Sequence, residues 1–262
     1  IIKNSEKLSY GYQTHLGYFS KPDVIENFFK EYKLGFNKVS LKIKSANEFD
    51  ESLNNIPKHQ IVINKDSGIK RQSLVDMKNI NFARVAKSFN KEKLFKFVVI
   101  DIETTGLRES RNKIIELSAI RFIDFEPTEC FSTLINPITK ISEEITKITS
   151  ITNEMVKEAP TISEVIEDFD KFVSGFNIVG YNTIFDLKFL FTNGSRILEQ
   201  KGIKFYDVCE LAKKVIDEGE SRKLDSVCEH FEIYRNTSHR SSSDCYATKL
   251  VFEKIIDEIV EN

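Results

Sequence analysis

The chain has 262 residues, of which 40% are hydrophobic and 30% are charged. This composition is ordinary for a globular protein, and no apolar run could span a bilayer, so we expect a cytoplasmic protein that makes no membrane contact. Four widely spaced cysteines without a C-x-x-C pair favour neither a disulfide framework nor a zinc site. The net charge of −2 conceals an asymmetry. Residues 1–96 hold 18 of the 38 basic and 10 of the 40 acidic side chains, a balance of +8 against −10 in the remainder.

The first third of the chain predicts a small α/β domain over residues 1–64, of unknown role. Residues 22–33 carry apolar side chains at helical spacing, and two short alternating or apolar runs at 39–43 and 60–64 are typical of strands. A basic connector, partly helical, is expected over 65–94. Its charge suits a surface that contacts phosphates, although a solvated lysine-rich surface is an equal alternative.

From residue 95 to 262 the pattern predicts a second, larger α/β domain. Buried strands are expected at 97–100 and 114–123, followed by a turn around Glu126-Pro127 and a third strand over 130–137. Short connections predict an antiparallel meander. Strand and helix patterns then alternate, which indicates a mixed sheet flanked by helices. The helices are expected at 142–149, 152–157, 161–172, 185–191, 208–216, 224–231 and from Ser241 onward, and the strands between them at 177–181 and 204–207.

Two carboxylates end the first strand of this domain, in the run Phe97-Val-Val-Ile-Asp101-Ile-Glu103. Strand side chains alternate, so Asp101 and Glu103 point to the same side. Two like charges held together at the end of a buried strand repel one another unless a cation lies between them. Because all the ligands would be oxygens, the pattern favours a hard cation such as Mg²⁺ or Mn²⁺.

Three segments together resemble the DEDDh family of 3′–5′ exonucleases, which includes the proofreading subunits of bacterial replicative polymerases. The segments are Asp101-Ile-Glu-Thr-Thr-Gly106, Tyr181-Asn-Thr-Ile-Phe-Asp186-Leu-Lys-Phe-Leu190 and His239-Arg-Ser-Ser-Ser-Asp244. They match the family's D-x-E-T-T-G, H-N-x-x-F-D-x-x-F-L and H-x₄-D motifs in order, except that Tyr181 stands where the family has His. The resemblance covers about Phe97 to Val260 and implies a ribonuclease-H-like five-stranded mixed sheet flanked by helices.

The resemblance also implies a site and a reaction. Asp101, Glu103, Asp186 and Asp244 would hold two Mg²⁺ or Mn²⁺ ions, and His239 would act as the general base. The reaction would remove nucleoside 5′-monophosphates from the 3′ end of single-stranded nucleic acid, with DNA favoured. The residues expected to contact the terminal nucleotides are Thr104, Gly106, Leu107, Asn182 and Phe185, although Phe185 is equally suited to the core.

Two alternatives stay open at this point. An exoribonuclease would share the fold and the site and differ in its contact to the 2′-hydroxyl. A non-catalytic scaffold that binds nucleic acid or a polymerase is less favoured, because the carboxylate set and His239 are complete. Residues 1–96 could also dock a polymerase or another protein partner.

Overall fold

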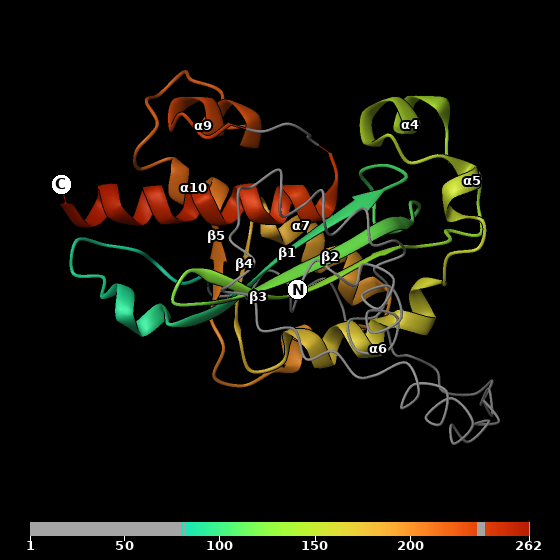
Figure 1. Cartoon of the computed structure of the whole chain (residues 1–262), viewed down its shortest axis with the longest axis horizontal. Coiled ribbons are helices and arrows are strands. Elements are labelled where there is room, and N and C mark those ends of the chain that lie inside the picture. Colours follow the sequence, from blue (N-terminus) through green and yellow to red (C-terminus); the bar gives the residue numbers. More distant parts are fainter. Residues whose placement is uncertain (1–79, 81, 235–238, 262) are drawn as a thin grey trace, which may run out of the picture.

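A five-stranded mixed sheet forms the centre of the protein in the computed structural model, which describes residues 80, 82–234 and 239–261. The strands lie in the order β3-β2-β1-β4-β5 (Figure 1). Their bounds are Lys96–Thr104 (β1), Ile114–Ile123 (β2), Glu126–Leu134 (β3), Asn177–Gly180 (β4) and Phe205–Asp207 (β5). The first three strands pair antiparallel, and β4 and β5 run parallel to β1. The expected meander and mixed sheet are confirmed.

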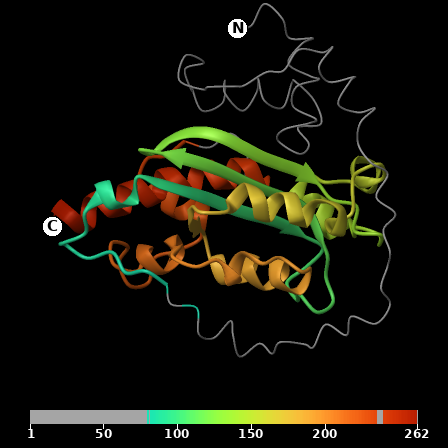
Figure 2. The ribbon, with the colours of Figure 1, turned by 90° about the horizontal axis from the view of Figure 1, so that it is seen from below.

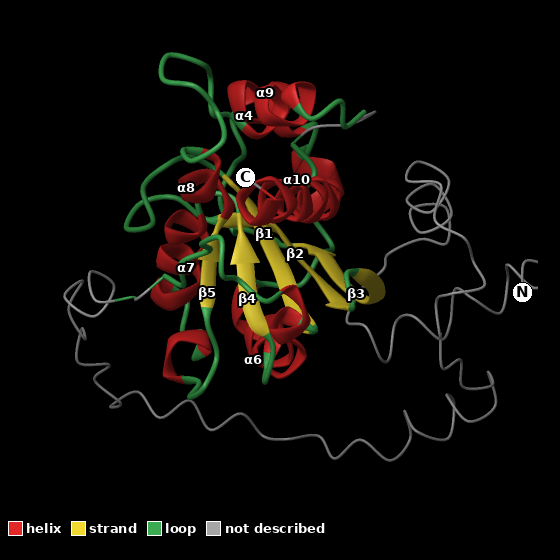
Figure 3. Ribbon diagram, turned by 90° about the vertical axis from the view of Figure 1, so that its left-hand side faces the viewer, coloured by secondary structure: helices red, strands yellow, loops and turns green. Residues whose placement is uncertain are grey.

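Helices cover both faces of this sheet, with α6 and α10 on opposite sides (Figures 2 and 3). The long helix α10 lies along β1 and β2 and contacts α8 and α9, whereas α7 packs against β1 and β4. The helices are α4 (Glu143–Thr149), α5 (Asn153–Val156), α6 (Ile162–Val173), α7 (Thr183–Thr192), α8 (Val208–Ala212), α9 (Leu224–His230) and α10 (Ser241–Glu261), with 3₁₀ turns η4 (Lys91–Leu94) and η5 (Ile197–Glu199). Among the described residues no helix is both long and apolar enough to cross a membrane.

The alternation of β1 divides the core into two layers. Phe97 and Val99 join the apolar cluster beneath α10, while Ile100 and Ile102 join the cluster beneath α6 and α7. The face of β1 that α10 covers is therefore apolar at the start of the strand. It becomes acidic toward the end of the strand, where Asp101 and then Glu103 take the place of apolar side chains. This change of polarity places the carboxylates at one end of a sheet whose core-facing side chains are otherwise mainly apolar.

The turn between β2 and β3 lies earlier than the sequence predicted. Asp124 and Phe125 have positive φ angles of 51° and 61°, as expected of a two-residue hairpin turn, and β3 begins directly afterwards at Glu126. Pro127 therefore lies within a strand rather than a turn. It is tolerated there because β3 is an edge strand and its pairing with β2 shifts register next to Pro127.

The segment before β1 packs on the core. Phe82 forms a parallel bridge with Phe205, and the amide of Ala83 donates to the Phe205 carbonyl at 2.7 Å, which extends the sheet past β5. Val85 and Leu94 are fully buried in the cluster beneath α10. The last part of the expected connector is thus attached to the larger domain. The domain predicted over 1–64 and the start of the connector lie outside the described residues.

Candidate active site

The candidate site lies at the carboxyl end of β1. Asp101 and Glu103 occupy alternate positions of this strand and point to the side covered by α10. Glu103 is directly opposite Glu116 of β2, and the register of the two strands shifts immediately after Glu103. The strand then ends at Thr104, so regular pairing with β2 holds both carboxylates in place close to the end of β1.

Asp186 reaches the same end of the sheet from α7. The short strand β4 stops at Gly180, and Asn182, in a left-handed conformation, precedes the first residue of α7. Asp186 lies in the first turn of that helix and is 3% exposed. Its Oδ1 accepts a hydrogen bond of 3.1 Å from the amide of Ile102, which lies between the two acids of β1. A backbone contact therefore fixes this carboxylate beside β1.

The start of α10 brings the remaining two residues. Ligand atoms of Glu103, His239 and Asp244 all lie within 4.8 Å of one another, which makes them a group able to hold a metal ion. His239 is exposed, has a φ of 59° and lies two residues before α10, whereas Asp244 is in the first turn of the helix. Figure 1 shows that α10 begins near the end of β1 and runs back along it. Asp101 and Asp186 are outside the group of three but interact electrostatically with each other.

The charges of this cluster oppose one another's ionisation. Burial, followed by the charges of Asp186 and Asp244, raises the pKa of Asp101 well above its usual range. Burial and the charges of Asp244 and Glu116 raise the pKa of Glu103 to about 8, although the Arg240 guanidinium acts in the opposite direction. Burial also raises the pKa of Asp186, against the hydrogen bond from Ile102. The site therefore carries more negative charge than its protein surroundings offset.

This imbalance and the type of donor fit a bound divalent cation. Carboxylate oxygens and an imidazole are ligands for Mg²⁺ and Mn²⁺ or for a softer ion such as Zn²⁺, and a preponderance of oxygens favours the harder ions. A cation among Asp101, Glu103, Asp186 and Asp244 would relieve the repulsion that, together with burial, raises the pKa values of Asp101 and Glu103. The residues present thus suit a divalent metal ion.

The loop after β1 supplies an open edge to the site. Thr104 is buried, and its hydroxyl donates to the Gly106 carbonyl at 2.7 Å. Gly106 has a φ of 152°, and a Cβ there would lie 2.7 Å from the Asn112 side-chain nitrogen, so a larger residue would displace the Asn112 side chain. Leu107 follows with 83% of its surface exposed. A buried anchor and a tight glycine thus present an apolar side chain to solvent.

The other expected substrate contacts lie around the start of α7. Asn182 is exposed, and its amide donates to Asp207 Oδ1 at 3.1 Å. Phe185 is half-buried, with its ring 5.0 Å from that of Phe189, so at least part of it belongs to the core. Tyr181, which replaces the family's histidine, is also half-buried, and its hydroxyl donates to the Arg222 carbonyl at 2.6 Å. That hydroxyl is therefore engaged in holding the loop before α9.

The structure adds two residues that the sequence analysis did not select, Glu116 and Arg240. Glu116 is 2% exposed, and Arg240 Nη2 lies 2.7 Å from its Oε1. A signal was present in the sequence, because Glu116 is the one carboxylate in a strand pattern that is apolar apart from Ser118 and Arg121, the same argument that identified Asp101.

Comparison with known proteins assigns the region that contains these residues to a family. The profile of the family described as Exonuclease (RNase_T) matches residues 98–252, which include all the site residues named above. The chain belongs to this exonuclease family. It is 36% identical over 167 residues to the DNA polymerase III subunit epsilon of Aquifex aeolicus, covering 62% of this chain and 81% of the relative. The resemblance to proofreading exonucleases is therefore confirmed.

Two further comparisons define how far the likeness extends. The exonuclease region is 35% identical over 165 residues to the PolC-type DNA polymerase III of Caldanaerobacter subterraneus subsp. tengcongensis, and it covers 63% of this chain but 12% of that relative. A crystal structure of E. coli Exonuclease I in complex with a dT13 oligonucleotide superposes with a TM-score of 0.54 at 19% identity, covering 61% of this chain and 40% of that one. The latter supports the fold alone.

Proposed function

We propose that this exonuclease is a metal-dependent 3′–5′ enzyme of the DEDDh type that releases nucleoside 5′-monophosphates from DNA. The observation that carries the proposal is the meeting of Glu103 from β1 with His239 and Asp244 from the start of α10, beside Asp101. These residues lie far apart in the sequence, and no requirement of packing explains why so many acids gather at one buried edge.

Asp101, Glu103, Asp186 and Asp244 are proposed to hold two divalent cations, Mg²⁺ or Mn²⁺. When bound there, such ions would offset the charge of a phosphodiester and lower the pKa of water. The carboxylates come from β1, α7 and α10, so the protein holds them in place before substrate arrives. Asp186 is further fixed by the Ile102 amide.

His239 is proposed to take the proton from the attacking water. Its ring lies within 4.8 Å of ligand atoms of Glu103 and Asp244, and it is exposed, so it can pass that proton to solvent. An imidazole changes its charge near neutral pH, which suits a general base. The water oxygen bonds to phosphorus, the bond from phosphorus to the 3′-oxygen of the remaining strand breaks, and that oxygen acquires a proton.

The loop after β1 is proposed to receive the terminal nucleotide. Gly106 allows close approach of the backbone, and Leu107, 83% exposed, offers an apolar surface to the last base. Thr104, Asn182 and Phe185 are the other proposed contacts. DNA is preferred as substrate because two of the similar proteins are DNA polymerase III chains. Residues 1–96, a proposed domain and basic connector, are proposed to aid binding of nucleic acid or of a polymerase.

The test uses the full chain and matched 20-nucleotide DNA and RNA strands, labelled at the 5′ end in one set and at the 3′ end in the other. With Mg²⁺ or Mn²⁺ the proposal predicts a ladder of shortened 5′-labelled DNA and release of a labelled mononucleotide from the 3′-labelled strand. EDTA should stop both. Faster degradation of RNA would instead assign the exoribonuclease activity, and loss of the 5′ label first would overturn the polarity.

A further inference from the structure

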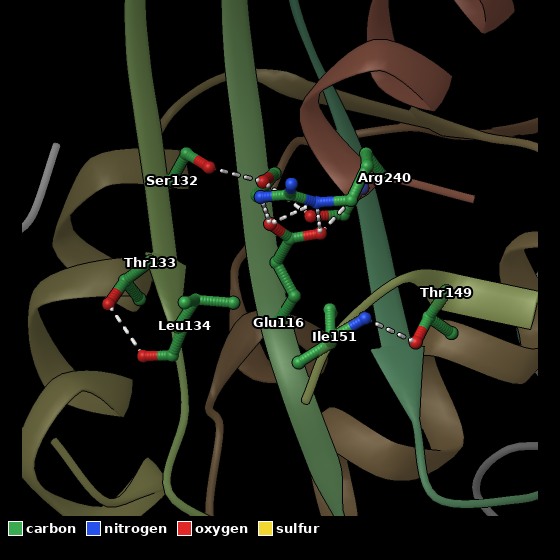
Figure 4. A network of polar contacts seen from close by, with 9 residues as sticks. Glu116, Ser132, Thr133, Leu134, Thr149, Ile151 and Arg240 are labelled. Carbon is green, nitrogen blue, oxygen red and sulfur yellow. Dashed lines mark hydrogen bonds and ion pairs between the residues drawn. The ribbon is translucent and has the colours of Figure 1, made fainter. Parts of the chain in front are cut away.

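Glu116 is a buried carboxylate in the largely buried strand β2 and is therefore costly unless it is paired. It is 2% exposed. Arg240 Nε donates to its two oxygens at 3.1 and 3.2 Å, and Arg240 Nη2 donates to Oε1 at 2.7 Å. The amide of Ser241 donates to Oε2 at 2.9 Å. Figure 4 shows the carboxylate of Glu116 facing the guanidinium of Arg240. One side chain of β2 thus holds both an arginine and the first amide of α10.

The position of this contact relates it to the candidate site. Glu116 and Glu103 are cross-strand partners, so their side chains lie on the same face of the sheet, next to each other. Arg240 lies between His239 and the first residue of α10, and the amide of Asp244 donates to the Arg240 carbonyl at 3.0 Å. The contact therefore connects the strand that faces Glu103 with the segment that carries His239 and Asp244.

Two further contacts fasten the same end of the helix to the sheet. The hydroxyls of Ser241 and Ser118 lie 2.6 Å apart, and Cys245 Sγ donates to the Val99 carbonyl at 3.5 Å. Neither contact reaches the residues before α10. A helix end frays readily because its first amides lack partners within the helix. The bidentate pair of Glu116 and Arg240 attaches the residue next to His239 to strand β2, beyond the reach of the other two contacts.

We infer that Glu116 and Arg240 are positioning residues, which keep His239 and Asp244 aligned with Glu103. The inference rests on the proposed function for the role of those three residues. The pair adds one negative and one positive charge, so it brings rigidity without adding net charge to the acidic site. Its members act through the residues they place and are not expected to contact the phosphodiester.

The test compares Glu116→Gln, Arg240→Met, the double variant and Arg240→Lys in the full chain. Hydrolysis of a 5′-labelled oligonucleotide gives kcat and KM, and calorimetry gives Mn²⁺ affinity. Either single change should lower kcat or Mn²⁺ affinity by about 10- to 100-fold, the usual effect of losing a group that orients metal ligands. KM should stay within about 2-fold. The double variant should lose no more than the worse single one, because the two act as a unit.

Arg240→Lys and a matched control separate positioning from simple stability. Lysine keeps the charge but lacks the planar fork, so Arg240→Lys should recover only part of the loss. Arg121 also lies on β2, pairs with Glu129 at 2.5 Å and donates to the Phe172 carbonyl, remote from the site. Arg121→Met should lower thermal stability and leave kcat and Mn²⁺ affinity within about 2-fold. Should a single variant fail to fold, the double variant, which leaves no unpaired charge, is compared with wild type and with Arg121→Met instead.

Three results would overturn the inference. Folded single variants with unchanged kcat and Mn²⁺ affinity would make the pair purely structural. Losses that multiply in the double variant would show two independent roles. A raised KM with unchanged kcat in Arg240→Met but not in Glu116→Gln would assign Arg240 to direct phosphate binding. Because Mn²⁺ affinity is measured separately, a wild-type protein that binds Mn²⁺ without cleaving would refute the proposed function alone.

Discussion

Replacing Glu103 with glutamine should stabilise the metal-free protein, and more so as the pH rises. Burial and neighbouring acids raise the pKa of Glu103 to about 8, from an ordinary value of 4.5. Between these values the folded state binds a proton that the unfolded state has lost. The free energy of unfolding of the wild type therefore falls as the pH rises from about 4.5 to about 8. Glutamine cannot ionise, so the variant should lack this part of the pH dependence.

The magnitude follows from the geometry of the site. Ligand atoms of Glu103 and Asp244 lie within 4.8 Å, and two unit charges at that distance repel by about 3 kcal/mol at an effective dielectric constant of about 20. At pH 9, where Glu103 is charged, Glu103→Gln should raise the free energy of unfolding by roughly that amount. For a domain of this size the gain corresponds to roughly 6–12 °C in Tm. At pH 5.5, about one unit above the ordinary value, Glu103 still holds its proton in the folded state, and the difference should be smaller, about 1.4 kcal/mol.

The assay is thermal unfolding of both proteins in EDTA from pH 5.5 to 9, repeated with Mn²⁺. With Mn²⁺ the order should reverse, because the wild type gains binding energy that the variant has lost. Glu167→Gln serves as the control, since Glu167 is an exposed residue of α6, which covers the other face of the sheet. It should show little change at any pH. A Glu103→Gln variant that is no more stable at pH 9 than at pH 5.5, relative to wild type, would refute the electrostatic account.

Three further predictions concern activity and binding. His239→Ala should lower kcat by roughly 10²–10⁴-fold, the usual effect of losing a general base, and should change Mn²⁺ affinity little. A kcat close to wild type would assign the role of general base to another residue. Leu107→Ala should raise KM for oligonucleotides while Tm stays within about 1 °C, since Leu107 is 83% exposed. An unchanged KM would exclude the proposed contact of Leu107 with the last base. A chain that begins at Ile80 retains the packed segment and should bind single strands with a shallower dependence of log K on log salt, by about 0.7 per lost phosphate contact. Equal slopes would favour a protein-docking role for the omitted residues.

Much of the fold could be predicted because local patterns and pairing agree. Three apolar runs with short connections specified the antiparallel meander, and the alternation along β1 determined which of its residues face α10. Boundaries were predicted less well where a local signal was misleading. Pro127 suggested a turn, yet an edge strand accepts proline. The helix expected over 208–216 ends at Ala212. The prediction was too long because the apolar spacing continues through Val215 and Ile216, which pack on the core from the turn after the helix.

The candidate site could likewise be predicted from the sequence only in part. The i and i+2 spacing placed Asp101 and Glu103 together, because a strand has a fixed period. No spacing relates Glu103 to residues more than a hundred positions later, so the approach of α10 came from the resemblance and from the three-dimensional structure. The start of α10 at Ser241 was expected from the sequence, but the contact of the Ser241 hydroxyl with Ser118 on β2 was not. The end of the helix is thus held by long-range contacts with Glu116 and Ser118, which sequence distance conceals.

The central claim is that the acidic cluster at the end of β1 carries metal-dependent removal of nucleotides from the 3′ end. Asp101→Asn tests it most directly, because the change neutralises one carboxylate and preserves its shape. Single-turnover degradation of a 5′-labelled DNA strand in Mn²⁺ should proceed stepwise from the 3′ end with wild-type protein. With Asp101→Asn the rate should fall by at least about 10³-fold while circular dichroism stays unchanged. A folded Asp101→Asn protein that degrades the strand at a rate near wild type would contradict the account.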